Sequence, residues 1–286
     1  MPLTLMYITN DLPVALIAEK YGVERVWIDL ETLGKEERQK GKDTVKSHHT
    51  ISDIAKIKPY LSSAEMLVRV NPWHDASKRE IDAVIAAGAD RIMLPYWKSS
   101  DEVRHFSDAV SARCATTLLL ETKEAEACLD EVLSIPGIDE IHIGLNDLHL
   151  SYGLDFMFEL LTNGTVERIC RKLAQAGIPY GFGGIAQIGQ GAVPAEKIIL
   201  EHYRLGSTRA ILSRSFCDTS KITDIDEINR IFFVHMKELR DYEKFAQRAS
   251  VEFLLKNQSE LSIGVESVVK YINARKRGEG NPCKKV

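Results

Sequence analysis

Short apolar runs alternate along the chain with longer segments of helical period. Eight runs are rich in aliphatic and β-branched residues, and they cover residues 3–10, 26–31, 66–71, 91–95, 116–122, 141–147, 180–186 and 209–216. Near-continuous apolar runs, rather than strict alternation, are typical of strands that are buried on both faces. Eight such strands alternating with helices predict a (β/α)8 TIM barrel, with a doubly wound open sheet as the competing fold.

Several of the intervening helices have recognisable end signals. Ser77 is followed three residues later by Glu80, which matches a capping box at the start of a helix. Pro194 predicts the first residue of another helix, and Gly206 predicts its end. These signals place helices between the predicted strands, as a barrel requires.

Two segments depart from the alternation. Residues 32–62 begin with a polar stretch, which predicts a long loop followed by a helix capped by Ser52. Residues 222–286 continue with helical periodicity beyond the eighth strand, so the chain divides into a barrel over 1–221 and a helical extension over 222–286. We expect the apolar face of the extension to pack on a neighbouring subunit of a homo-oligomer, with packing on its own barrel as the alternative.

Composition narrows the classes of partner. The 286 residues carry 37 Lys and Arg against 41 Asp and Glu, a net charge of −4, which does not favour nucleic acid as a partner. The five cysteines form no CxxC pair, the start shows no signal peptide, and no apolar stretch approaches 18 residues. These features predict a cytoplasmic protein that binds a small molecule and no membrane.

Polar residues interrupt several apolar runs near their carboxyl ends, where the active site of a barrel lies. Asp29 and Glu31, Glu121, and Asp147 would bring carboxylates together at one end of the barrel. Like charges repel there unless a cation or a shared proton compensates. Glu121 and Asp147 therefore predict a site for Mg²⁺ or Mn²⁺, although either residue could instead cap a helix.

Arg69 and a histidine pair are further candidates for chemistry. Arg69 lies within an apolar run and needs an anionic partner, either a substrate carboxylate and enolate oxygen or a structural salt bridge to Asp29 or Glu31. His48 and His49 follow the second strand and could supply a general base, or could be solvated loop residues.

Aromatic residues follow the third and fourth predicted strands. Trp73 and Trp97 could form a wall of the substrate pocket or cover the rim of the barrel, and we expect Trp97 to contact the substrate.

Five segments in order resemble the HpcH/HpaI aldolase/citrate lyase family, part of the phosphoenolpyruvate/pyruvate barrel superfamily; they are VWIDLE (26–31), VRVNP (68–72), GADRIMLP (88–95), LLLETKEA (118–125) and IGLNDLHLSYG (143–153). The resemblance implies a divalent metal held by Glu121 and Asp147, and contact of Arg69 with the oxo or enolate oxygen of the substrate. It also implies that the backbone from Gly144 through Asn146 to Asp147 helps to bind the substrate carboxylate. Glu31, in the segment shared with the citrate-lyase-like branch, is placed with the substrate-binding residues.

The chain departs from the family pattern after the second strand. Many aldolase members carry a Glu-His pair there, whereas Glu31 is followed by Thr32 in this sequence. We hypothesise that His48 or His49 replaces the missing histidine as the proton-transfer group, with a metal-bound water as the alternative.

The combined features predict a metal-dependent carbon–carbon lyase of the class II aldolase type, which joins a 2-oxo acid to an aldehyde, or separates them, through a pyruvate enolate. One alternative is a lyase for an acyl-CoA thioester, for which the basic candidates Lys42, Lys46 and Lys98 are scattered. The other is a barrel that binds a carboxylate without catalysis, which the missing histidine would permit.

Overall fold

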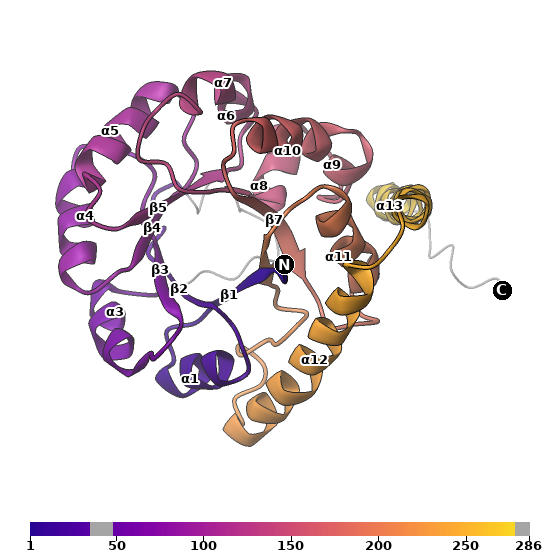
Figure 1. The fold of residues 1–286 in the computed structure, drawn as a ribbon, viewed down its shortest axis with the longest axis horizontal. Coiled ribbons are helices and arrows are strands. Elements are labelled where there is room, and N and C mark those ends of the chain that lie inside the picture. The colour runs from indigo at the N-terminus through magenta and orange to yellow at the C-terminus, as the bar shows by residue number, and fades with distance from the viewer. Residues whose placement is uncertain (35–47, 278–286) are drawn as a thin grey trace.

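Eight parallel strands close into a barrel in the computed structural model, which describes residues 1–34 and 48–277 (Figure 1). Each strand pairs with the next and β8 pairs with β1, so the predicted (β/α)8 barrel is confirmed and the open sheet is excluded. The strands are β1 (Thr4–Ile8), β2 (Arg25–Asp29), β3 (Glu65–Arg69), β4 (Arg91–Leu94), β5 (Ala115–Leu120), β6 (Ile141–Ile143), β7 (Tyr180–Ile185) and β8 (Arg209–Leu212). Because all strands are parallel, their carboxyl ends lie together at one end of the barrel.

Helices surround the barrel between successive strands (Figure 1). They are α1 (Leu12–Lys20), α3 (Ile51–Ile57), the 3₁₀ helix η1 (Lys58–Tyr60), α4 (Ser77–Ala86), α5 (Ser100–Val110), α6 (Lys123–Ala127), α7 (Leu129–Val132), α8 (Leu145–Ser151), α9 (Glu159–Thr162), α10 (Thr165–Gln175), α11 (Ala195–Arg204), α12 (Ile225–Ala246) and α13 (Val251–Lys276). The part of the chain expected to be a long loop, residues 35–47, lies outside the described residues.

Two expected helix signals are wrong. The Glu80 carboxylate accepts hydrogen bonds from the Asn71 side chain instead of closing a capping box, and Ser77 bonds to His74. Helix α3 begins after Thr50, whose backbone N–H donates to the Asp53 side chain at 2.8 Å, so Ser52 does not cap it. At the start of both helices, the polar side chains form hydrogen bonds with partners other than those that the sequence spacing predicts.

Strand β6 is shorter than the sequence pattern predicts. It ends at Ile143, and Gly144 precedes helix α8, which begins at Leu145. Asp147 therefore lies in the first turn of a short helix rather than at the end of a strand.

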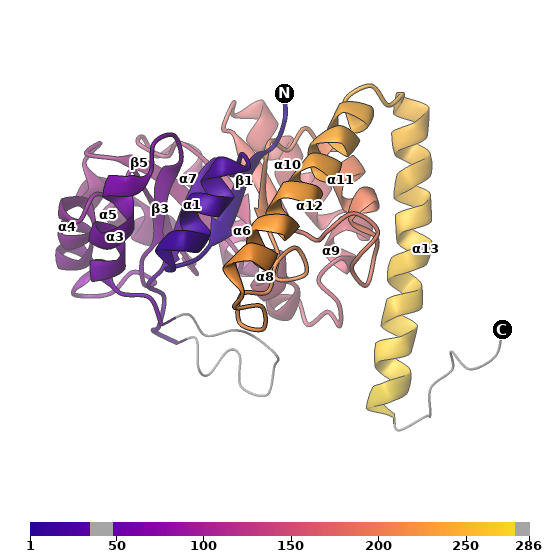
Figure 2. The same cartoon turned by 90° about the horizontal axis from the view of Figure 1, so that it is seen from below.

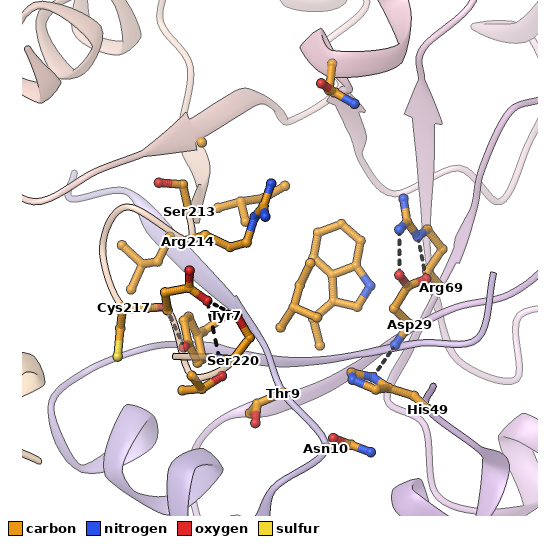
Figure 3. A pocket seen from close by; sticks show the side chains of 18 of the residues that line it. Tyr7, Thr9, Asn10, Asp29, His49, Arg69, Ser213, Arg214, Cys217 and Ser220 are labelled. Atoms are coloured by element: carbon orange, nitrogen blue, oxygen red, sulfur yellow. Dashed lines mark hydrogen bonds and ion pairs between the residues drawn. The ribbon is translucent and has the colours of Figure 1, made fainter. Parts of the chain in front are cut away.

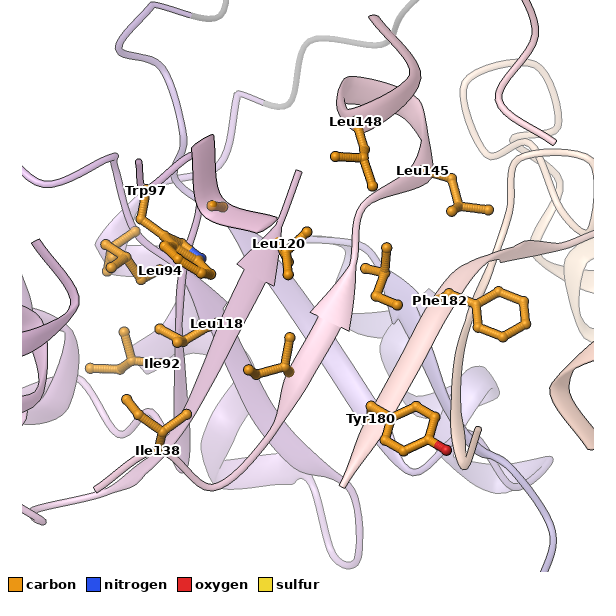
Figure 4. Packing of buried hydrophobic residues seen from close by; sticks show 14 of the residues in the cluster. Ile92, Leu94, Trp97, Leu118, Leu120, Ile138, Leu145, Leu148, Tyr180 and Phe182 are labelled. Carbon is orange, nitrogen blue, oxygen red and sulfur yellow. The ribbon is translucent and has the colours of Figure 1, made fainter. Parts of the chain in front are cut away.

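Apolar side chains fill both the space between strands and helices and the interior of the barrel. Figure 4 shows the outer layer, in which Ile92, Leu118, Leu120 and Phe182 project from the strands. The interior holds a second cluster, formed by Met6, Trp27, Leu67, Met93 and Leu119. The two layers arise because successive side chains of a strand point to opposite faces of the sheet, one towards the helices and one towards the barrel interior.

The two C-terminal helices pack on their own barrel (Figure 2). Helix α12 contacts α1 and α11, and it buries Phe232, Met236 and Leu239 in the core that they share. Helix α13 contacts α9 and α11 and buries Leu261 and Val265. The buried face of these helices thus follows the alternative considered from the sequence, packing on their own barrel, while packing of the extension on a neighbouring subunit of a homo-oligomer stays a prediction. No helix among residues 1–34 and 48–277 combines the length and the apolar character of a membrane crossing.

The amino ends of the strands carry a partly buried ionic network, which we call the lower cluster, formed by the buried Arg25, Arg91 and Glu140 with the more exposed Glu65 and Arg209. Glu140 accepts from Arg25 Nη1 at 2.6 Å and from Arg209 Nε at 2.7 Å, and Glu65 accepts from both Arg25 and Arg91. Burial opposes the charge of Glu140, but the hydrogen bonds and charge of Arg25 lower its pKa to about 2. The lower cluster closes the barrel at the end away from the expected active site.

Candidate active site

A cavity of about 780 Å³ opens at the carboxyl ends of the strands. Residues from the ends of β2, β3, β5 and β6 line one side, and residues from β1, β8 and the start of α12 line the other. We call the charged group on the first side the upper cluster; it comprises Asp29, Glu31, Arg69, Glu121 and Asp147. All of these except Glu31 line the cavity.

Arg69 is held by a two-pronged contact with Asp29. The two residues are register partners on β2 and β3, and Arg69 Nε and Nη2 donate to the two Asp29 carboxylate oxygens at 2.8 Å each. Arg69 Nη1 lies 3.3 Å from Glu31 Oε2. Burial opposes the guanidinium charge, but the two carboxylates raise the pKa of Arg69 above its ordinary range. The structural salt bridge considered from the sequence is therefore present, and Arg69 also faces the cavity.

Glu121 is held in place by a backbone hydrogen bond and by the close approach of Gly144. Its Oε1 accepts a hydrogen bond from the Tyr96 backbone N–H at 2.9 Å, and the residue is only 2% exposed. A β-carbon added to Gly144 would lie 2.9 Å from both Glu121 Cβ and Glu121 Oε2. Gly144 is therefore required for the close approach of α8 to Glu121, and not for an unusual φ angle.

Asp147 lies at the cavity with little exposure. It is 9% exposed, and among residues 1–34 and 48–277 no hydrogen bond or ion pair joins its side chain to another group. A buried carboxylate is unfavourable unless a cation or a hydrogen-bond donor compensates it.

The pair of carboxylates fits a hard divalent cation. No cluster of three or more His, Cys, Asp or Glu side chains with metal-binding geometry occurs in the described chain. Mg²⁺, however, keeps several waters and needs only one or two protein carboxylates. Glu121 and Asp147, both at the same cavity, meet this smaller requirement.

Both candidate bases line the cavity. His49 Nδ1 accepts a hydrogen bond from the backbone N–H of Asp29 at 3.0 Å, so a neutral His49 carries its proton on Nε2. His48 is exposed and lies beside it in sequence. Figure 3 shows His49, Asp29 and Arg69 on the same side of the cavity. The contact with Asp29 connects His49 to the residue that orients Arg69.

Comparison with known families gives a direct match. The model of the HpcH/HpaI aldolase/citrate lyase family matches residues 4–175, more than half of the chain. The chain belongs to this family. No curated protein matches it.

Solved structures of HpcH/HpaI family members share the fold at low sequence identity. A family protein from Burkholderia cenocepacia has a TM-score of 0.56 and 16% identity, covering 79% of this chain and 94% of that one. An aldolase of the family from Desulfitobacterium hafniense has a TM-score of 0.57 and 14% identity, covering 79% and 93%. The protein CitE from Mycobacterium tuberculosis, solved in complex with magnesium and acetate, has a TM-score of 0.55 and 13% identity, covering 92% and 97%.

Trp97 does not contact the cavity, so the expectation that it forms a pocket wall is not met. It is fully buried and packs in the outer layer beside Leu94 (Figure 4). The preceding Tyr96 takes a left-handed φ of 50°, and its N–H donates to Glu121, so the chain has turned away from the barrel axis before Trp97. Trp73 stacks on His105, also outside the cavity lining.

Some of the other residues predicted to bind substrate line the cavity, and others do not. Gly144 and Asn146 line the cavity, whereas Glu31 contacts Arg69 from outside the lining. Of the scattered basic candidates, Lys98 does not line the cavity, and Lys42 and Lys46 lie outside the described residues.

The opposite wall of the cavity was missed in the sequence. Figure 3 shows Tyr7, Ser213, Arg214, Cys217 and Ser220 on that side. The Tyr7 hydroxyl donates to the Cys217 carbonyl at 3.0 Å, which joins β1 to the segment after β8. The eighth apolar run was expected to be a strand through residue 216. Strand β8 ends at Leu212, and the polar residues that follow turn over the cavity.

Proposed function

We propose that the chain is a metal-dependent carbon–carbon lyase of the class II aldolase type, which forms a pyruvate enolate and joins it to an aldehyde or reverses that reaction. The observation that supports it best is the carboxylate of Asp147, which has no hydrogen bond or ion pair to residues 1–34 and 48–277 and lies in one cavity with Glu121 and Arg69. The similar structure of CitE from Mycobacterium tuberculosis was solved in complex with magnesium and acetate, which agrees with this chemistry.

Glu121 and Asp147 would hold Mg²⁺ or Mn²⁺, which when bound supplies Lewis-acid polarisation of the 2-oxo group. The remaining steps belong to the protein. Arg69 directs its guanidinium to the cavity, where negative charge develops on the enolate oxygen. Asp29 and Glu31 use three of the five N–H groups of that guanidinium, so two remain for the substrate. Asp29 and Glu31 therefore orient Arg69 without occupying it completely.

His48, which lines the cavity, is the base that we assign to proton transfer. In the cleavage direction the base takes the proton of the 4-hydroxyl group, the C3–C4 bond breaks, and the aldehyde leaves. His49 also lines the cavity, but its Nδ1 already accepts from the Asp29 backbone N–H, so a neutral His49 offers the substrate an N–H donor at Nε2 and no lone pair for a proton.

Deuterium exchange of the pyruvate methyl group tests the proposal because it needs no aldehyde. We expect exchange in the presence of Mg²⁺ or Mn²⁺, followed by NMR, and loss of exchange in Glu121→Gln and Asp147→Asn. Binding of Mn²⁺, followed by electron paramagnetic resonance, should weaken in the same two variants. The matched control is Asp130→Asn, an exposed aspartate paired with Lys172, which should keep both properties.

Two results would contradict the proposal. Absence of exchange with either metal would exclude the aldolase chemistry and favour a barrel that binds a carboxylate without catalysis. Exchange that persists in both variants would exclude Glu121 and Asp147 as the metal ligands.

A further inference from the structure

The wall of the cavity opposite the upper cluster carries an arginine that the proposed enolate chemistry does not use. Arg214 follows the end of β8 by two residues, lines the cavity and is exposed. Figure 3 shows its side chain extending into the cavity from the side opposite Arg69. Because the proposed metal ligands lie on the same side as Arg69, Arg214 faces the part of the cavity that remains for the second reactant.

The ends of β7 and β8 bring Arg214 together with a serine and two glycines. Gly184 is the register partner of Ile211 on β8, and a β-carbon added to Gly184 would lie 3.2 Å from Ser213 Cβ. Gly183, Gly184, Ser213 and Arg214 all line the cavity. Since neither glycine places a side chain in the cavity, the space beside Ser213 and Arg214 is left for a ligand.

The carboxylates of the opposite wall have partners within that wall. Asp218 Oδ1 accepts from the Ser220 hydroxyl at 2.6 Å, and Asp218 Oδ2 lies 3.2 Å from Lys221 Nζ. The hydrogen bond from Ser220 is the main cause that lowers the pKa of Asp218, so this carboxylate is ionised and its charge is offset by Lys221. Asp11 Oδ1 caps helix α1 by accepting from the Val14 backbone N–H at 3.0 Å. These contacts leave the guanidinium of Arg214 as a positive group that this wall presents to an anion.

The position and the chemistry of this corner both favour a phosphate group. In barrels of this architecture, a phosphate is frequently bound by the loops after the seventh and eighth strands. The guanidinium of an arginine matches two oxygens of a phosphate, and a serine hydroxyl can donate to a third. Among residues 1–34 and 48–277, no hydrogen bond uses the Ser213 hydroxyl. Ser213 and Arg214 therefore supply donors for three phosphate oxygens from adjacent positions.

We propose that Ser213 and Arg214 bind the phosphate group of a phosphorylated acceptor aldehyde. The inference rests on the proposed aldolase function and names its substrate class. Arg214 donates to two phosphate oxygens, and the Ser213 hydroxyl donates to the third. A carboxylate has only two oxygens and would leave the Ser213 hydroxyl without a partner, so we expect the site to prefer phosphate.

The cavity has room for both reactants. Its volume of about 780 Å³ lies within the range of about 300–1,000 Å³ that holds drug-sized ligands, and it extends from the upper cluster to Arg214. In the condensation, the methyl carbon of pyruvate forms a bond with the aldehyde carbon. The methyl group loses one proton, the aldehyde oxygen gains one, and the phosphate group is unchanged. No further reactant is needed, so the bound phosphate serves only to hold and orient the aldehyde.

The test compares aldehydes with and without an anionic group in condensation with pyruvate. Glyceraldehyde 3-phosphate is paired with glyceraldehyde, and 4-oxobutanoate is paired with butanal as the carboxylate arm. The ratio of kcat/KM for the anionic aldehyde over the neutral one is measured for each pair. We expect about tenfold or more for the phosphate pair, because hydrogen bonds to a charged group are strong, and less than about threefold for the carboxylate pair.

Three variants connect the phosphate ratio to the proposed site. Arg214→Gln removes the guanidinium and should bring the ratio close to one. Arg214→Lys keeps the charge but loses the two-pronged contact, so it should keep only part of the ratio. Ser213→Ala removes one donor and should lower the ratio about threefold. The control is Arg171→Gln, an exposed arginine on α10 outside the cavity lining, which should keep the wild-type ratio.

A binding measurement tests the site without catalysis. Glycerol 3-phosphate has no aldehyde group, and its binding can be followed by isothermal titration calorimetry in the absence of divalent metal. We expect Arg214→Gln to weaken this binding about tenfold or more, and Arg171→Gln to leave it unchanged. Equal binding by the wild type and Arg214→Gln would overturn the inference.

The kinetic outcomes separate this inference from the proposed function. A phosphate ratio near one, in a wild-type protein that exchanges the pyruvate methyl group, would overturn the inference and leave the proposed function in place. A carboxylate ratio above the phosphate ratio would also overturn it, as would a phosphate ratio that Arg214→Gln does not change. Absence of methyl exchange in the wild type would overturn the proposed function, and with it the assignment of an acceptor aldehyde.

Discussion

The two ends of this barrel carry two buried charged clusters of the same size and opposite character. The lower cluster joins three arginines to two glutamates, and every one of the five residues has an ion pair. The upper cluster has one arginine and four carboxylates among the described residues, and Asp147 has no protein partner.

The difference shows what each cluster does. In the lower cluster each charged group is paired with another protein group, so we expect this cluster to stabilise the fold. The upper cluster has more carboxylates than cationic groups, which is the arrangement expected if a cation binds at the carboxyl ends of the barrel strands, as we propose. The two clusters should therefore respond to mutation in opposite ways.

The largest effect on stability is expected in the lower cluster. Glu140→Gln leaves Arg25 and Arg209 without their shared carboxylate in a buried site, and breaking such a network costs about 3–5 kcal/mol. Urea denaturation followed by circular dichroism measures this loss. A loss below about 1 kcal/mol would show that Glu65 alone compensates the arginines.

The upper cluster should respond through activity rather than stability. Asp147→Asn removes a proposed metal ligand and should lower pyruvate methyl exchange about 10²–10³-fold, as loss of one transition-state charge contact does. Its midpoint of urea denaturation should change little, because the Asp147 side chain lines the cavity and makes no hydrogen bond or ion pair to the described residues. A large loss of stability would instead indicate a structural partner for Asp147.

The stability supplied by Glu140 should depend on pH. Its folded-state pKa is lowered from the ordinary value of 4.5 to about 2, so its contribution is complete above about pH 4.5 and is lost as the pH falls towards 2. The full contribution corresponds to about 3 kcal/mol. The difference in unfolding free energy between the wild type and Glu140→Gln should therefore shrink between pH 5 and about pH 2.5. A constant difference would mean that Glu140 is not ionised in the folded protein.

The smallest effect is expected where the same kind of ion pair lies in solvent. Arg171 and Glu167 form a pair at 3.5 Å on helix α10, and the Arg171 side chain is 68% exposed. Arg171→Ala should change the unfolding free energy by less than about 0.5 kcal/mol. This variant is the solvent-exposed reference for Glu140→Gln. A comparable loss of unfolding free energy in both variants would contradict the expectation that a buried ion pair contributes more than an exposed one.

Much of the barrel is readable from the sequence because buried strands leave long apolar runs. Glu121 and Arg69 are candidates for the same reason, since a charged residue within or directly after such a run is conspicuous, and both line the cavity. Asp147 lines the cavity as well, but the pattern predicts a strand there because it does not show that Gly144 ends β6 and precedes a helix.

Other residues that line the cavity cannot be predicted in this way. Trp27 and His142 line it but lie inside apolar runs, where an aromatic ring is indistinguishable from a core residue. The polar residues after β8 were read as part of a strand, and Trp97 was read as a wall because its position after β4 does not reveal the turn at Tyr96. Residues far apart in the sequence face each other across the cavity because the strands close into a barrel, and the order of residues along the chain does not show which of them will do so.

Closure of the barrel has a consequence for how this protein could diverge. The family match ends at residue 175, whereas β7, β8 and α12 come afterwards in the chain and still reach the cavity, because β8 pairs with β1. The carboxylates that we propose as metal ligands and the wall that faces them are thus encoded in separate stretches of the chain. Changes after residue 175 can therefore alter the facing wall of the cavity while Glu121 and Asp147 are inherited unchanged, so chimeras exchanged after residue 175 would show how far this wall determines what the cavity accepts.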